Sequence, residues 1–274
     1  MNARKAPRMN AQKGWRRAMR RVAAVLVALA VSGCGADGGR ASGGAADGRG
    51  VGAVTVFAAA SLTESFTRIG KDFEAANPGS SVTLNVAGSS ALANQINQGA
   101  PADVFASAAP ANMSTVSEAG NADGTPSIFA RNQLVIAVPR GNPEGVKGLA
   151  DLGKPGVKVA LCATQVPCGA AARTALDSAG ITLTPATLER DVKGALAKVK
   201  LGEVDAALVY RTDALAASAD VTGVEFPESA RAVNDYLIVA LKDAPNPTAA
   251  RAFVAYVRSA SAQAVLVEAG FQAP

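Results

Sequence analysis

Short apolar runs alternate with helical patterns along the chain from about residue 51 to its end. Most of the apolar runs are followed by a longer helical stretch, and this repeated order predicts an α/β fold. Such strand–helix units favour mostly parallel sheets with right-handed crossovers. The expected strands are residues 54–58, 81–86, 104–106, 134–138, 157–160, 206–209 and 236–241, and the expected helices are residues 62–76, 91–99, 111–119, 169–179, 192–201 and 248–269.

Small or polar residues stand at the expected start of several helices, close after a strand. Ser61-Leu62-Thr63-Glu64 has the capping-box pattern, which predicts Ser61 as the N-cap of the first helix. Ser89, Cys168 and Asp191 lie at the starts of later helices. Because strand carboxyl ends and helix starts meet at one edge of such a sheet, their N–H groups and hydroxyls can form an anion site. Taken alone, each position is better explained as a helix cap, and only their recurrence favours the anion site.

Tyr210 follows the apolar run 206–209 and fits two interpretations equally well. It is either a core aromatic residue or, at a strand end that faces a cleft, a hydroxyl donor to a ligand.

The chain contains no histidine. The commonest general base and metal ligand is therefore missing, which excludes a Ser-His-Asp hydrolase and disfavours a zinc enzyme. Residues 148–154 match the spacing G-x-x-x-x-G-K, but Pro155 replaces the Ser or Thr that a nucleotide-binding loop needs. The sequence also lacks the G-x-S-x-G and S-x-x-K patterns of serine-nucleophile enzymes. Binding is thus favoured over catalysis.

The first 33 residues have the pattern of a secretory signal. Residues 1–21 carry eight basic side chains and no acid, and an apolar run follows over residues 22–31. This run is too short to span a bilayer permanently, and its flanks are typical of a cleaved signal peptide. Val31-Ser32-Gly33-Cys34 resembles a bacterial lipobox, which predicts cleavage before Cys34 and attachment of lipid to it. The alternative is an ordinary signal peptide with a coincidental cysteine.

Residues 34–50 are expected to form a flexible tether, because this stretch is rich in glycine and has no large apolar side chain to bury. Without the leader, residues 34–274 have 19 basic and 22 acidic side chains, a net charge of −3. The basic character of the whole chain therefore belongs to the leader, and nothing indicates a nucleic-acid partner.

Two cysteines remain once Cys34 is assigned to lipid. Cys162 and Cys168 can pair in the oxidising surroundings of an exported protein, or they can be buried free thiols. Export favours a disulfide that closes a small loop.

Six segments resemble, in the same order, the periplasmic molybdate-binding proteins of ABC transporters, the ModA family. The resemblance extends over residues 53–274, and its specificity comes from the six segments together. They are residues 54–63 (VTVFAAASLT), 87–96 (AGSSALANQI), 99–105 (GAPADVF), 166–169 (VPCG), 191–196 (DVKGAL) and 208–210 (LVY).

This resemblance implies the two-lobed type II periplasmic binding protein fold, with two mixed sheets flanked by helices and a ligand cleft between the lobes. Residues 51–130 together with 243–274 are expected to form the first lobe, and residues 131–242 the second. Closure of the lobes on the ligand would be the signal that an importer detects.

The resemblance further implies a molybdate site made only of hydrogen-bond donors. Molybdate is a tetrahedral dianion without protons, so neutral donors and helix dipoles can hold it without a buried counter-charge. Cys168 stands where the family often has alanine, which a backbone amide tolerates. The implied ligand residues are Ser61 and Ser89 through hydroxyl and amide groups, Cys168 and Val192 through backbone amides, and Tyr210 through its phenol.

The expected protein is a monomeric lipoprotein on the extracytoplasmic face of the cell membrane, anchored through Cys34. It would capture molybdate, and tungstate about as well, without a cofactor, and deliver it to an ABC importer permease. One alternative is a receptor for another oxyanion, chiefly sulfate. Two others are an extracytoplasmic enzyme with Ser61 as its nucleophile and a purely structural surface lipoprotein.

Overall fold

The computed structural model describes residues 50–274. The expected signal peptide (residues 1–33), the lipidation site Cys34 and the tether up to residue 49 therefore lie outside the described residues. Within residues 50–274, no helix has both the length and the apolar character needed to cross a membrane.

The first of two sheets has the strand order β2-β1-β3-β10-β4. β1 runs parallel to β2 and β3, whereas β10 runs antiparallel to β3 and β4. The strands are β1 (Ala53–Ala59), β2 (Ser81–Ala87), β3 (Val104–Ser107), β4 (Ala122–Asn132) and β10 (Asn234–Leu241).

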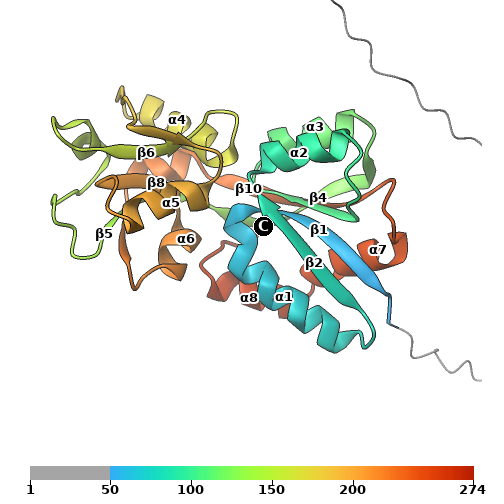
Figure 1. Cartoon of the computed structure of the whole chain (residues 1–274). Coiled ribbons are helices and arrows are strands. Elements are labelled where there is room, and N and C mark those ends of the chain that lie inside the picture. The colour runs from blue at the N-terminus through green and yellow to red at the C-terminus, as the bar shows by residue number, and fades with distance from the viewer. Residues whose placement is uncertain (1–49) are drawn as a thin grey trace, which may run out of the picture. The chain divides into compact units, whose positions relative to one another are not determined.

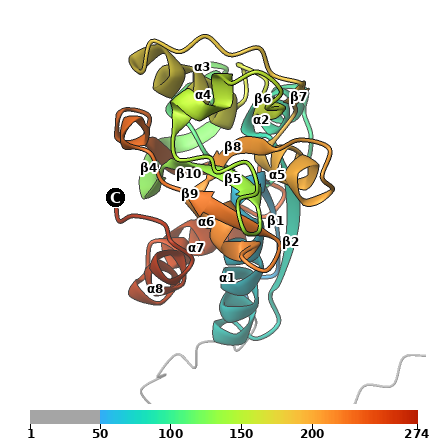
Figure 2. The ribbon, with the colours of Figure 1, turned by 90° about the vertical axis from the view of Figure 1, so that its left-hand side faces the viewer.

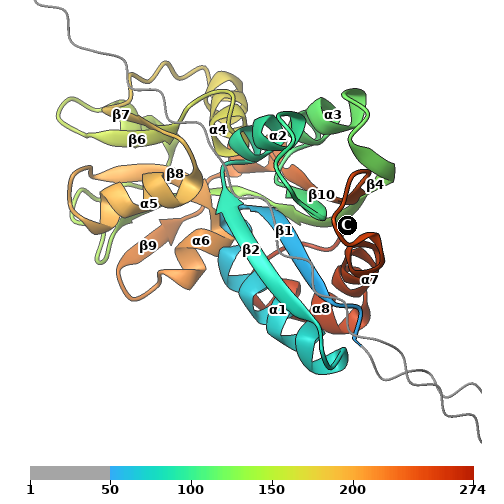
Figure 3. The ribbon, with the colours of Figure 1, turned by 45° about the vertical axis from the view of Figure 1, so that its right-hand side comes forward.

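Helices cover both faces of this sheet (Figure 3). In β1, Val56 packs against one group of helices and Phe57 against the other, because successive strand residues point to opposite faces. Both faces of the central strands β1 and β3 are thus buried, which explains why these two strands are almost entirely apolar. One face carries α1 (Thr63–Ala76), α7 (Pro247–Val257) and α8 (Ala260–Glu268), and the other carries α2 (Ser89–Asn97) and α3 (Pro110–Glu118).

The second sheet has the order β7-β6-β8-β5-β9, with β6 parallel to β7 and β8 and β5 antiparallel to β8 and β9. It builds a separate hydrophobic core with its own helices, seen on the left of Figure 1 and facing the viewer in Figure 2. Its elements are β5 (Leu134–Pro139), η2 (Leu149–Gly153), β6 (Val159–Cys162), α4 (Pro167–Ser178), β7 (Thr187–Glu189), α5 (Val192–Lys200), β8 (Ala206–Tyr210), α6 (Arg211–Ala216), β9 (Val221–Val224) and η3 (Pro227–Arg231).

Each sheet with its helices is called a lobe below. The chain crosses between the lobes twice, and only Gln133 separates β4 of the first from β5 of the second. The return crossing lies between β9 and β10. β10 belongs to the first lobe because it pairs with β3 and β4 and buries both its faces there. The expected lobe limit at residue 242 was therefore placed too late.

The expected two mixed sheets are present, but the expectation of mostly parallel pairing was wrong, since β5 and β10 each pair antiparallel with both neighbours. Strands β4, β7 and β9 and helix α6 were not expected. The long helix expected at residues 248–269 is two helices, because Ser259 caps a new one by accepting a hydrogen bond from the N–H of Ala262.

Asp103 of the G-A-P-A-D segment has a structural role. Its buried carboxylate accepts hydrogen bonds from the N–H of Thr55 at 2.7 Å and of Asn246 at 2.6 Å. Asn246 in turn caps α7 by accepting from the N–H of Ala249. Asp103 thus joins β1, β3 and the start of α7.

Candidate functional site

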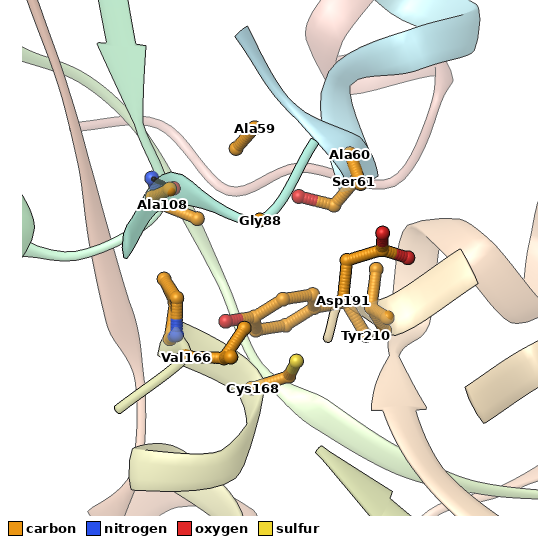
Figure 4. A pocket seen from close by; sticks show the side chains of 12 residues that line it. Ala59, Ala60, Ser61, Gly88, Ala108, Val166, Cys168, Asp191 and Tyr210 are labelled. Atoms are coloured by element: carbon orange, nitrogen blue, oxygen red, sulfur yellow. Dashed lines mark hydrogen bonds between the residues drawn. The ribbon is translucent and has the colours of Figure 1, made fainter. Parts of the chain in front are cut away.

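A small cavity lies between the lobes, where strand ends and helix starts of both sheets meet. The space that the centre of a water-sized sphere can occupy there is about 10 Å³, which is far smaller than the pockets that hold drug-sized ligands. In Figure 4, Ser61 and Gly88 lie on one side of this space and Val166 and Cys168 on the other. All five residues expected to bind the ligand are among the lining residues, which are Ala59, Ala60, Ser61, Gly88, Ser89, Ala108, Val166, Pro167, Cys168, Asp191, Val192 and Tyr210.

Ser61 lies in a single 3-10 turn, Ala60–Leu62, between β1 and α1. The prediction that it caps α1 was wrong, because the N-cap is Leu62 and no side chain makes the capping bond. Glu64 points elsewhere, to Lys193 of the second lobe. The hydroxyl of Ser61 is instead hydrogen-bonded to the phenol of Tyr236, with Oγ and Oη 2.8 Å apart.

Ser89 is the first residue of α2, and Gly88 is its N-cap. Ser89 is buried, and its Oγ accepts a hydrogen bond from the N–H of Ala108 at 3.0 Å. That bond fixes the oxygen and leaves the hydroxyl proton of Ser89 free to point into the cavity. The N–H of a first helical residue also has no partner within its own helix.

Cys168 is the second residue of α4, after the N-cap Val166 and Pro167. It forms a disulfide with Cys162, the last residue of β6. The bond ties the end of that strand to the start of the helix, so it holds the helix N-terminus in place at the cavity. Backbone N–H groups at this end of the helix carry its positive dipole end.

Asp191 is the N-cap of α5, and its carboxylate accepts a hydrogen bond from the N–H of Gly194 at 2.9 Å. This confirms that Asp191 is a helix cap, as the sequence predicted. Val192 is the first residue of the helix, so its N–H lacks a helical acceptor. The acid at the cavity wall is thus engaged with its own helix.

Tyr210 ends β8 with its side chain fully buried. Its phenol points into the cavity (Figure 4), and it has no hydrogen-bond partner among the residues that the structure describes. Burial raises the pKa of Tyr210 well above its usual value, so the phenol keeps its proton. A buried donor without a partner costs free energy, which a bound acceptor would recover.

An ion-pair network connects the lobes beside the cavity. Lys193 Nζ lies 2.8 Å from Glu64 Oε2 in the first lobe and 2.9 Å from Asp213 Oδ1 in the second. Burial raises the pKa of Asp213 to about 6 against the opposing effect of Lys193. Although burial lowers the pKa of Lys193, the two carboxylates raise it overall, so the lysine is charged.

Gly88 lies in close contact with the second lobe. A Cβ built on it would lie less than 3.0 Å from the carbonyl oxygen of Arg190 and 3.5 Å from Val166 Cγ1, both in the second lobe. Its φ of −60° and ψ of 135° suit any residue, so glycine is required here only by the opposite lobe. The lobes are therefore in close contact across the cavity.

Sequence reasoning missed Tyr236, Lys193, Asp213 and the role of Gly88. Tyr236 lies 175 positions from Ser61, and no local pattern connects the two. Glu64 was seen only as half of a capping box. These contacts arise from the packing of the lobes, which the sequence does not display locally.

Comparison with known proteins identifies the family. Residues 54–272 match the family described as bacterial extracellular solute-binding proteins. The chain is 47% identical over 253 residues to the molybdate-binding protein ModA of Mycobacterium tuberculosis strain H37Rv. The aligned region covers 92% of this chain and 96% of that protein. The chain belongs to the ModA family.

Two solved structures share the fold. The periplasmic molybdate-binding protein of Azotobacter vinelandii superposes with a TM-score of 0.70 at 20% identity, covering 81% of this chain and 99% of that one. The sulfate-binding protein SubI of Mycobacterium tuberculosis gives the same TM-score at 18% identity, covering 81% and 87%. These likenesses establish the two-lobed binding-protein fold, and they do not distinguish between the two anions.

Proposed function

We propose that this protein captures molybdate outside the cytoplasm and delivers it to an ABC importer. The observation that carries this proposal is a cavity whose polar groups are arranged as donors. The oxygens of Ser61 and Ser89 are already hydrogen-bonded within the protein, and the protonated phenol of Tyr210 has no partner among the described residues. Such a site suits an anion that has no proton to donate.

Three helix N-termini add to this donor set. α2, α4 and α5 begin at the cavity with Ser89, Cys168 and Val192 within their first two residues. Backbone amides and helix dipoles favour negative charge at these positions, and the residues that line the cavity include no lysine or arginine. Ser61, Ser89, Cys168, Val192 and Tyr210 are accordingly the proposed ligand residues.

We propose molybdate rather than sulfate as the ligand because the chain is 47% identical to a molybdate-binding protein. The fold likeness does not decide between the two anions, since the molybdate-binding and sulfate-binding structures superpose with the same TM-score. Tungstate resembles molybdate in size and charge and is expected to bind about as well. An enzyme with Ser61 as nucleophile is disfavoured, because the hydroxyl pairs with the phenol of Tyr236 rather than with a base.

We place the capture of the ligand at the outer face of the cell membrane. The leader of residues 1–33, lipid on Cys34 and the glycine-rich tether would hold a monomeric receptor at the outer face of the membrane. The closed lobes would then dock on the permease. Release of a lipid-modified peptide that begins at Cys34, detected by mass spectrometry, tests the anchor.

Calorimetric titration of the purified protein with molybdate, tungstate, sulfate and phosphate tests the ligand. Calorimetry is preferable to intrinsic fluorescence, because the single tryptophan, Trp15, lies in the leader. We expect one-to-one binding of molybdate and tungstate and no heat from the other two. Tighter binding of sulfate than of molybdate would overturn the proposed ligand. The absence of binding heat with all four anions would overturn the proposed binding function.

A further inference from the structure

Tyr236 is buried behind Ser61 and is not part of the cavity wall. Its ring packs edge-on against Tyr210 and Phe271, with centroids 5.9 and 5.3 Å apart. The ring is held from both sides, so the position of its hydroxyl is fixed. That hydroxyl is hydrogen-bonded to Ser61, with Oη and Oγ 2.8 Å apart.

The direction of this hydrogen bond follows from chemistry. Burial raises the pKa of Tyr236 well above its usual value, so the phenol keeps its proton. A buried hydroxyl proton needs an acceptor, and Ser61 Oγ lies within hydrogen-bonding distance of it. When Tyr236 donates to Ser61, the serine oxygen is occupied on that side and its own proton is turned toward the cavity.

Ser89 repeats this arrangement with a different donor. Its Oγ accepts from the N–H of Ala108 at 3.0 Å, and that donor can never accept in return. Both serine oxygens are therefore hydrogen-bonded to a group of the protein, one on β10 and the other directly after the neighbouring strand β3. The difference is that only Tyr236 can be removed by a substitution that keeps the shape of the side chain.

We propose that Tyr236 is a positioning residue that fixes Ser61 as a hydrogen-bond donor and thereby makes the cavity selective for tetrahedral oxyanions without protons. The inference rests on the proposed oxyanion site and names its source of selectivity. A protonated oxyanion such as hydrogen phosphate needs an acceptor for its proton. Without the phenol of Tyr236, the hydroxyl of Ser61 is free to rotate and become that acceptor.

The variant Tyr236→Phe tests this role because it keeps the ring and removes only the hydroxyl. By calorimetry we expect the molybdate Kd to rise about 10-fold, as for a lost hydrogen bond to a charged group. Tyr256→Phe is the matched control, since Tyr256 packs on Phe73 away from the cavity, and its molybdate Kd should not change. An unchanged Kd in Tyr236→Phe would overturn the inference.

A double-mutant cycle separates positioning from general packing. If Tyr236 acts through Ser61, then Tyr236→Phe should have almost no further effect on molybdate binding in a Ser61→Ala background. Additive losses of affinity would show that Tyr236 acts by another route and would overturn the inference.

Competition with inorganic phosphate tests the selectivity directly. Phosphate in large excess should leave the apparent molybdate Kd of the unmodified protein unchanged and raise that of Tyr236→Phe. If phosphate leaves the apparent molybdate Kd unchanged in both proteins, the proposed role of Tyr236 in selectivity is overturned. If the unmodified protein binds none of the four oxyanions, the proposed function fails instead, so the two failures are distinguishable.

Discussion

Replacement of Gly88 by alanine is the sharpest test of lobe contact at this site. The added methyl would lie less than 3.0 Å from the carbonyl oxygen of Arg190, whereas an ordinary contact is about 3.5 Å. The lobes must then separate by on the order of 0.5 Å or more at this point. Ser89 on one side and Val192 on the other would move apart, although both are proposed to hold the same ion.

The expected cost follows from overpacking. Inserting a methyl into a tightly packed contact typically costs about 1–3 kcal/mol, which corresponds to a Kd that is roughly 5- to 150-fold higher. The backbone at Gly88 accepts alanine without strain, because its φ is −60°. The penalty should therefore appear in ligand affinity, with only a small loss of stability in the protein without ligand.

Gly148→Ala is the matched control. Gly148 is also an N-cap in extended backbone, but a Cβ there would meet nothing within 4 Å. Calorimetry should give an unchanged molybdate Kd for Gly148→Ala and a raised one for Gly88→Ala. Equal Kd values for the two variants and the unmodified protein would refute the reasoning that the lobes meet at Gly88 when the ligand is bound.

Three further predictions concern charged and polar groups. Tyr210→Phe removes a buried donor that has no partner among the described residues, so the ligand-free variant should melt at a higher temperature than the unmodified protein. Calorimetry should show at least about 10-fold weaker molybdate binding by this variant. A lower melting temperature would contradict the prediction. Glu64→Gln breaks the ion pair between the lobes and should raise the molybdate Kd up to about 5-fold at low salt, whereas Glu268→Gln, which breaks an ion pair within the first lobe, should not. Asp213 has its pKa raised from 3.8 to about 6 by burial, so relative to Asp213→Asn the protein should lose about 2 kcal/mol of unfolding free energy as pH rises from 4 to 7. Parallel denaturation curves at all pH values would contradict the last prediction.

The fold class could be predicted because its strands are buried on both faces. β1 and β3 are almost entirely apolar and are each followed closely by a helix that the sequence also predicts, and this local pattern is sufficient. β4 was missed for the opposite reason. It is an edge strand with Gly124 and Pro126, where weak propensity is tolerated and pairing with β10 is irregular.

The expected ligand residues lie together because each follows a strand of a sheet edge that faces the cavity. Their role in binding stays a prediction, but their convergence needed only chain order and the general geometry of α/β sheets. The partners of these residues were inaccessible to such reasoning. Tyr236 reaches Ser61 only because β10 returns to the first sheet, and an isolated tyrosine in an apolar strand carries no sign of it.

The connection at Gln133 restricts the kind of motion that the lobes can make. A single residue joins β4 to β5, and its neighbour Asn132 is tied to the second lobe by a 2.9 Å hydrogen bond to Thr212. If one lobe slid along the other, the short connection would pull β4 and β5 out of their sheets. Rotation of one lobe against the other needs only a change in a few backbone dihedral angles near Gln133. The two lobes would thus close by rotation about a hinge and would meet in the same alignment each time. The donors on the two sides of the cavity would then return to the same relative positions whenever an ion binds.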